Sequence, residues 1–183
     1  MKTITTLLIA NRGEIACRIM RTAKALGLTT VAVHSAIDHS ARHVREADIA
    51  IDLGGAKPAD SYLLMDKIIE AARASGAEAI HPGYGFLSEN ATFARKLEAA
   101  GLIFLGPPAS AIDAMGSKSA AKALMEEAGV PLVPGYHGAA QDLDTFRSAA
   151  QQIGYPVLLK ATAGGGGKGM KIVEREADLA DAL

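Results

Sequence analysis

The sequence predicts an α/β fold, with an open parallel sheet in an N-terminal domain that is followed by the start of a second unit. Short apolar runs alternate with longer amphipathic stretches along the first 106 residues. Glycines follow the amphipathic stretches, as they do at helix ends, and the strand, helix, strand spacing has the length that a parallel crossover requires. Together these observations indicate a parallel sheet with helices on its faces.

Residues 1–106 are expected to form alternating strands and helices. The expected strands are 5–10, 29–34, 48–53, 79–81 and 103–105, and the expected helices are 14–26, 63–75 and 90–100. Gly27, Gly76 and Gly101 follow the three helices and supply their ends. The first helix is expected to bury a face that includes Ile19 and Leu26.

The character of the sequence changes at the Gly-Pro-Pro of residues 106–108. Ser117 can cap a helix that runs to about residue 128, within a helical linker of residues 107–135. A helix at 143–153, strands at 155–161 and 170–173, and a last helix from about 177 are expected to follow. The last helix has no stop signal before Leu183, so we expect an N-terminal piece of a longer protein. The predicted division is therefore 1–106, 107–135 and an incomplete unit at 136–183.

Composition excludes several classes of protein. The 19 basic and 20 acidic residues give a formal charge of −1, which does not support nucleic-acid binding by a broad basic surface. The single cysteine, Cys17, lies at an apolar helix position and is expected to be a buried thiol. The short apolar run near the N-terminus lacks a cleavage site, and no segment is long enough to span a membrane. We therefore expect a cytoplasmic protein.

A glycine-rich stretch, VLLKATAGGGGKGMKIV at 157–173, carries the clearest functional signal. Gly164, Gly166 and Gly169 satisfy G-x-G-x-x-G, but the residues that follow alternate like a strand, whereas a dinucleotide site requires a helix there. A phosphate-binding P-loop is excluded because Lys168 precedes a glycine instead of serine or threonine. The stretch predicts a hairpin flap whose backbone N–H groups close over phosphates. A surface hairpin without a ligand is the alternative.

Two lysines extend this prediction. Lys160 ends the strand that enters the glycine loop, so its ammonium group can reach the same phosphates; a solvated lysine at a strand end is the alternative. Lys118 lies in the first turn of the helix capped by Ser117, where a cation is unfavourable unless an anion compensates.

Six motifs together resemble the biotin carboxylase component of biotin-dependent carboxylases. They are IANRGEIACRIMRTAKALG, HPGYGFLSEN, FLGPP, MGSKSAAK, GVPLVPG and IGYPVLLKATAGGGGKGMKIV. The resemblance implies an ATP-grasp ligase, in which ATP and bicarbonate give carboxyphosphate and the carboxyl group moves to biotin on a carrier domain. It also implies an α/β first domain, followed by a lid domain and a large ATP-grasp sheet.

The resemblance further implies roles for particular residues. It makes Lys118 and Lys160 ligands of ATP, places Gly165, Gly166, Gly167 and Lys168 in the phosphate-covering lid, and brings Tyr84, Gly85 and Glu89 toward biotin and bicarbonate. The residues that bind Mg²⁺ and catalyse the reaction are expected beyond Leu183. Asn11 to Glu14 follow the first strand but lack the glycines of a nucleotide site, so we assign them to architecture.

The implied partners are ATP, bicarbonate, a biotin carrier domain and a carboxyltransferase subunit, in a homo-oligomer when full length. The implied whole is an acyl-CoA carboxylase, with methylcrotonyl-CoA or a similar branched substrate as one candidate acceptor. Two alternatives stay open: another ATP-grasp ligase such as carbamoyl phosphate synthetase, and a truncated, non-catalytic nucleotide-binding or assembly module. The HPGYGFLSEN motif favours biotin carboxylase over carbamoyl phosphate synthetase.

Overall fold

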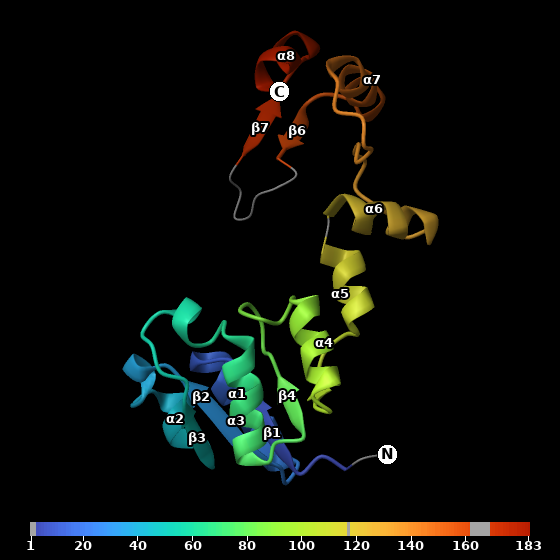
Figure 1. The fold of residues 1–183 in the computed structure, drawn as a ribbon. Coiled ribbons are helices and arrows are strands. Elements are labelled where there is room, and N and C mark those ends of the chain that lie inside the picture. Colours follow the sequence, from blue (N-terminus) through green and yellow to red (C-terminus); the bar gives the residue numbers. More distant parts are fainter. Residues whose placement is uncertain (1–2, 117, 162–168) are drawn as a thin grey trace. The chain divides into compact units, whose positions relative to one another are not determined.

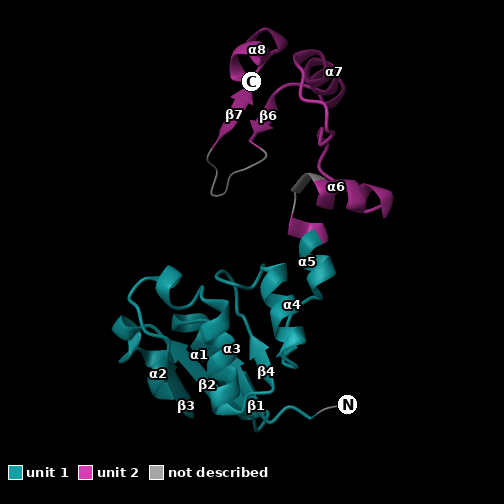
Figure 2. Cartoon of the chain, in the orientation of Figure 1, with its two compact units in different colours: residues 1–113 teal, residues 114–183 magenta. Residues whose placement is uncertain are grey.

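Two compact units make up the chain in a computed structural model that describes residues 3–116, 118–161 and 169–183. The first unit is Met1–Asp113 and the second is Ala114–Leu183 (Figure 2). The three-part division expected from the sequence, with boundaries at 106 and 135, stays a prediction about the longer protein. Within the described ranges, every helix falls short of the length and apolar character that a membrane crossing requires.

A five-stranded parallel sheet forms the centre of the first unit (Figure 1). Its strands are β1 (Thr6–Ile9), β2 (Thr29–His34), β3 (Ile49–Asp52), β4 (Ala79–His81) and β5 (Ile103–Phe104). They lie in the order β3-β2-β1-β4-β5, and every neighbouring pair is parallel. The predicted open parallel sheet is therefore confirmed. The strands β2 and β3 are added on one side of β1, and β4 and β5 are then added on the other side. The strand order therefore reverses between β1 and β4.

Helices cover both faces of this sheet. They are α1 (Gly13–Ala25), α2 (Arg42–Glu46), α3 (Met65–Ser75), α4 (Ala91–Ala99) and α5 (Ala109–Gly116), with short 3₁₀ turns η1 (Ala36–Asp38) and η2 (Pro58–Asp60). On one face α1 packs Ile19 and Met20 against Leu7 and Ile9. On the other face α3 and α4 cover Leu8, Val31, Val33 and Ile80 with Ile68, Phe93 and Leu97. Burial on both faces of β1, β2 and β4 explains why these strands read as continuous apolar runs.

Two expectations from the sequence were wrong in detail. Leu26 is 71% exposed because α1 ends at Ala25 and Leu26 is already the C-cap residue, turned off the apolar face. The helix α5 lies within the range expected to be a helical linker, but the sequence did not indicate it as a helix separate from the one after Ser117; it packs Ile112 against Ala91 and Ala94 of α4. Cys17 is buried on α1, as expected.

Carboxylates anchor the amino-terminal edge of the sheet. The side chain of Glu78, just before β4, accepts hydrogen bonds from the backbone N–H groups of Thr5 (2.9 Å) and Thr6 (2.8 Å) at the start of β1. The side chain of Asp48, just before β3, accepts from the backbone N–H (2.8 Å) and hydroxyl (2.7 Å) of Thr30 in β2. Each carboxylate accepts hydrogen bonds from donors of a neighbouring strand. These contacts fix the strand register at the amino-terminal edge, opposite the loops that follow β1 and β4.

At the carboxyl-terminal edge, the loops after β1 and β4 are joined by one buried side chain. Asn11 is 4% exposed, and its amide nitrogen donates to the carbonyl oxygens of Pro82 and Tyr84, both at 2.8 Å. Gly83 lies between these two acceptors with φ +67°, and a Cβ added there would be 2.7 Å from the Asn11 amide nitrogen. Glycine is therefore required at position 83 both by backbone conformation and by the space that Asn11 occupies.

The second unit holds a two-stranded hairpin and three helices in its described part. The elements are α6 (Lys118–Glu127), α7 (Leu143–Ile153), β6 (Val157–Lys160), β7 (Met170–Val173), η3 (Glu176–Asp178) and α8 (Leu179–Ala182). Asp142 caps α7 by accepting the N–H of Thr145 at 2.9 Å. The strands β6 and β7 pair antiparallel, as the sequence predicted. Among the described residues of this unit, the buried apolar ones are Ala150, Val173 and Leu179, so the core that they form is small.

Replacing Gly83 with alanine should destabilise the chain by about 2 kcal/mol or more, because the new Cβ adds a clash with Asn11 to the ~1–2 kcal/mol of left-handed backbone. Gly76→Ala is the matched control, since Gly76 has φ +70° but open space at its Cβ position, and it should cost only about 1 kcal/mol. Urea unfolding monitored by circular dichroism measures both. Equal losses for the two variants would show that the Asn11 contact does not constrain Gly83.

Acid should destabilise the chain in part through Asp48. Hydrogen bonds from Lys24 and then from the N–H and hydroxyl of Thr30 lower the pKa of Asp48 from 3.8 to about 2. Because the folded-state pKa is below the unfolded one, this stabilisation is complete above about pH 4 and is lost as the pH falls toward 2. Asp48→Asn should therefore flatten the decline of the urea midpoint between pH 4 and 2, and an unchanged slope would contradict this role of Asp48.

Candidate functional site

The loop after β4 carries the residues expected near biotin and bicarbonate. It leaves β4 at His81, whose Nδ1 accepts the N–H of Gly83 at 3.0 Å. Burial lowers the pKa of His81, which keeps the ring neutral and this nitrogen able to accept. This contact gives His81 a structural role. The ring fixes the first turn of the loop instead of facing a ligand.

Tyr84 and Gly85 lie at the exposed tip of this loop. The Tyr84 side chain is 61% exposed, and its hydroxyl donates to a carboxylate oxygen of Glu14 in the first turn of α1. That carboxylate raises the pKa of Tyr84, so the phenol stays a proton donor. Gly85 has φ +67° and open space where a Cβ would stand, so a ligand can approach its backbone closely. Glu89 is exposed at the end of the loop, beside Asn90, which caps α4.

A cluster that the sequence did not reveal lies behind this loop. Arg12, next to Asn11, forms an ion pair with Asp38 at 3.2 Å and lies over the rings of Tyr62 and Phe86, 5.5 and 5.7 Å from their centroids. Arg12 and its three partners come from loops that follow four different strands, so no local spacing connects them. Phe86 lies within the HPGYGFLSEN motif, but nothing in the sequence indicated that Arg12 and Tyr62 would contact it.

The second candidate site is a face of the hairpin in the second unit. In the register of β6 and β7, Leu158 is opposite Ile172 and Lys160 is opposite Met170, so these four side chains share one face. The three apolar members are exposed, at 56% for Leu158, 69% for Ile172 and 42% for Met170. The opposite face carries Val173, which is 1% exposed. The hairpin thus buries Val173 on one side and presents on the other side an apolar surface beside Lys160.

The remaining residues expected at this site are described only in part. Lys118 is the first residue of α6, as expected, but its side chain lies outside the described part of the structure. Gly165, Gly166, Gly167 and Lys168 also lie outside the described residues, which leave β6 at Ala161 and resume at Gly169. The hairpin that flanks the loop is therefore observed, and the predicted roles of these five residues stay predictions.

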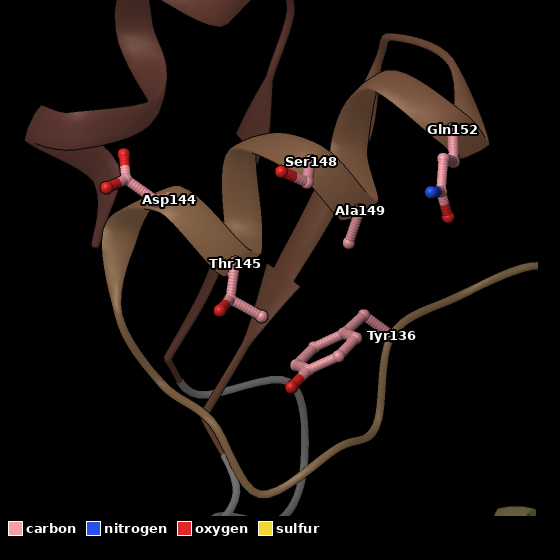
Figure 3. Close-up of a pocket in the computed structure, with 6 residues that line it drawn as sticks. All are labelled: Tyr136, Asp144, Thr145, Ser148, Ala149 and Gln152. Carbon is pink, nitrogen blue, oxygen red and sulfur yellow. The ribbon is translucent and has the colours of Figure 1, made fainter.

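A shallow pocket of about 420 Å³ lies elsewhere on the second unit, along α7 (Figure 3). It is lined by Tyr136, Asp144, Thr145, Ser148, Ala149 and Gln152. Figure 3 shows Thr145 and Ala149 on the side of the helix that faces the Tyr136 ring. The residues predicted to bind ATP are not among these lining side chains, so we do not assign the pocket to the nucleotide. Within the described ranges, no three His, Cys, Asp or Glu side chains gather as a metal site requires.

Two family models together match nearly the whole chain. The model described as biotin carboxylase, N-terminal domain, matches residues 3–112. The model described as carbamoyl-phosphate synthase L chain, ATP binding domain, matches residues 117–183. The first match covers the parallel sheet with its carboxyl-edge loops, and the second covers the hairpin with its lysines.

Individual relatives agree with these matches. The mitochondrial methylcrotonoyl-CoA carboxylase subunit alpha of Dictyostelium discoideum is 60% identical over 183 residues, which is 100% of this chain and 26% of that protein. The propionyl-CoA carboxylase alpha chain of Ruegeria pomeroyi is 55% identical over 166 residues, 91% of this chain and 24% of that protein. The chain thus spans about a quarter of the length of these relatives.

A solved structure extends the likeness to the fold. The biotin carboxylase domain dimer of Hydrogenobacter thermophilus 2-oxoglutarate carboxylase, in complex with MgADP, ADP and bicarbonate, has a TM-score of 0.86 and 49% identity over 99% of this chain and 40% of that chain. Sequence and fold therefore agree. Since the N-terminal domain model alone covers more than half of the 183 residues, the chain belongs to the biotin carboxylase family.

Proposed function

We propose that this chain is the N-terminal part of a biotin carboxylase subunit, which uses ATP and bicarbonate to carboxylate biotin on a carrier domain through carboxyphosphate. The observation that carries the proposal is the hairpin face, where Lys160 lies beside exposed apolar side chains at the entrance to the glycine loop. An ATP-dependent ligase needs a cation for phosphate and an apolar surface for the base, and this face offers both.

In this proposal the hairpin grips one side of the nucleotide. The ammonium group of Lys160 compensates phosphate charge, and Leu158, Ile172 and Met170 pack against the flat base. Lys118 adds a second cation, and Gly165, Gly166, Gly167 and Lys168 close over the phosphates with backbone N–H groups. Mg²⁺, when bound, supplies charge stabilisation during phosphoryl transfer; we assign its ligands, like the catalytic residues, to the protein beyond Leu183.

The loop after β4 serves the second half-reaction in this proposal. Tyr84 offers a phenol that keeps its proton, Gly85 offers backbone that a ligand can approach, and Glu89 offers an exposed carboxylate. These groups are suited to bind and orient biotin or bicarbonate rather than to form bonds with them. The Hydrogenobacter structure, whose description includes bicarbonate, supports bicarbonate as a substrate here.

A carbamoyl phosphate synthetase is the second candidate, because the model that matches residues 117–183 bears that description. The match of residues 3–112 to the biotin carboxylase N-terminal domain favours the first proposal. Among acceptors, we favour methylcrotonyl-CoA over propionyl-CoA, since identity is 60% to the Dictyostelium subunit and 55% to the Ruegeria chain. The carrier domain, the carboxyltransferase subunit and a homo-oligomer belong to this proposal; the dimer of the Hydrogenobacter domain supports the last of these.

The compartment is also a proposal. We keep the cytoplasmic location expected from the sequence, although the Dictyostelium relative is described as mitochondrial and the Ruegeria relative is not. The deciding assay for function is ATP hydrolysis by the full-length protein, with and without bicarbonate and free biotin. Hydrolysis that requires both supports biotin carboxylase, whereas hydrolysis that requires bicarbonate with ammonia or glutamine supports the synthetase.

Lys160→Ala in the full-length protein should weaken ATP binding roughly 10- to 150-fold, because one charge-assisted phosphate contact is worth about 1.5–3 kcal/mol. Lys171→Ala is the matched control: Lys171 is exposed on the neighbouring strand, but its register with Leu159 places it on the opposite face of the hairpin. Calorimetric titration with ATP measures both variants. Unchanged affinity for Lys160→Ala, or an equal loss for Lys171→Ala, would contradict the assignment.

Valine at both Gly166 and Gly167 should slow ATP-dependent biotin carboxylation, because side chains there keep the backbone from approaching the phosphates. Biotin-dependent phosphate release is measured at saturating and at limiting ATP, with Gly129→Ala, at the end of α6, as a glycine control outside the loop. Wild-type rates for the double variant under both conditions would show that the loop does not close over phosphate.

A further inference from the structure

Four loops at the carboxyl edge of the first unit meet around the guanidinium group of Arg12. Its central carbon lies 5.5 Å from the centroid of the Tyr62 ring and 5.7 Å from that of Phe86. The two rings are themselves stacked, with centroids 5.1 Å apart and planes within 3°. Arginine is suited to this position because its planar cation stacks on aromatic faces while its N–H groups bind a carboxylate.

Asp38 holds the guanidinium group in place. A single oxygen, Oδ2, accepts from Arg12 (3.2 Å), from the Ser35 hydroxyl (2.8 Å) and from the Tyr62 hydroxyl (2.7 Å). Burial acts to raise the pKa of Asp38, but the hydrogen bonds from Tyr62, Ser35 and Arg12 outweigh it and the net pKa is lowered. The carboxylate is therefore charged at neutral pH. Tyr62, 1% exposed, is fixed in turn because its hydroxyl also accepts the N–H of Ser35 at 3.1 Å.

Phe86 has a backbone that needs such support. Its φ is +43°, a left-handed conformation that residues with a side chain rarely adopt and that persists only where the surroundings hold it. Gly85 immediately before it, at φ +67°, also turns left-handed. The Phe86 ring contacts both Tyr62 and Arg12, and these side-chain contacts help to keep this turn in place.

The loop that carries Tyr84 and Gly85 is therefore gripped by three residues of the segment after β1. Asn11 binds its backbone, Glu14 binds the Tyr84 hydroxyl, and Arg12 holds Phe86. We propose that Arg12 is a positioning residue for biotin carboxylation, which acts through Phe86 to keep Tyr84 and Gly85 in the geometry that receives biotin and bicarbonate. This inference rests on the proposed function, and Arg12 itself is not expected to touch a substrate.

The kinetic test uses the full-length carboxylase with Arg12→Met, Arg12→Lys and the control Arg95→Met. Arg95 also forms an ion pair in the first unit, with Asp113 at 2.6 Å, but lies on α4 outside the cluster. Arg12→Met should lower kcat/KM for biotin and bicarbonate roughly tenfold or more, since displaced binding groups lose rate steeply, while KM for ATP stays within about twofold. Arg12→Lys should recover part of the loss, because it keeps the charge beside Asp38 but not the planar stacking.

A second measurement does not depend on activity. Amide hydrogen exchange at Ser88, whose N–H donates to the Gly85 carbonyl at 2.9 Å, should quicken about fivefold or more in Arg12→Met and not in Arg95→Met. Amides of β2 report whether the variant remains folded. Unchanged exchange at Ser88 overturns the inference whatever the kinetics show.

The outcomes separate the inference from the proposed function. Wild-type enzyme without ATP hydrolysis dependent on biotin and bicarbonate overturns the proposed function, and the catalytic part of the inference falls with it. Wild-type activity that Arg12→Met retains in full overturns the inference alone. A parallel fall in kcat/KM for ATP, biotin and bicarbonate also overturns it, because general destabilisation accounts for such a loss. Only a selective loss with faster Ser88 exchange supports it.

Discussion

The buried amide of Asn11 is the contact on which the functional edge of the first unit depends. Strand order reverses between β1 and β4, so the loops that follow these strands lead in opposite directions, and a crevice is expected between them. In many α/β proteins a ligand occupies that crevice. Here the Asn11 side chain occupies it and binds both Pro82 and Tyr84. The reversal point thereby holds a loop in place, and Tyr84 and Gly85, which we propose to receive biotin and bicarbonate, lie further out on that loop.

The two edges of the sheet are stabilised by different chemistry. At the amino edge, Glu78 and Asp48 bind backbone donors of the adjacent strands, and these contacts serve pairing alone. At the carboxyl edge, the Asn11 amide, the guanidinium group that the Asp38 carboxylate holds, and the stacked rings bind loops to one another. Because the carboxylates fix strand register at the amino edge, the loops at the carboxyl edge do not have to fix it. Loop conformations such as those of Gly85 and Phe86 can therefore be strained without disturbing strand register.

Much of this architecture could be predicted from sequence, because it depends on local pattern. Apolar runs predicted the strands. Gly76 predicted the end of α3 because glycine readily adopts the left-handed conformation, here φ +70°, that commonly ends a helix. The start of α5 could not be located from sequence because Gly-Pro-Pro is typical of a linker, whereas here Pro108 directly precedes the first helical residue. The cluster around Arg12 could not be found, since Asp38, Tyr62 and Phe86 meet only after four strands have paired.

For the hairpin of the second unit, the sequence pattern predicted a phosphate-binding role but not the apolar character of its exposed face. Alternation in a strand predicts one buried and one solvated face, yet the outward face of β6 and β7 presents Leu158, Ile172 and Met170. Apolar side chains gathered on an exposed face lose the stabilisation that burial gives, at about 25 cal/mol per Å² of apolar area left in water. Such a face is understandable if something covers it during function. In the function proposed above, a nucleotide base covers this face while its phosphates meet Lys160, and the surface that is unfavourable in the free hairpin then contributes to binding.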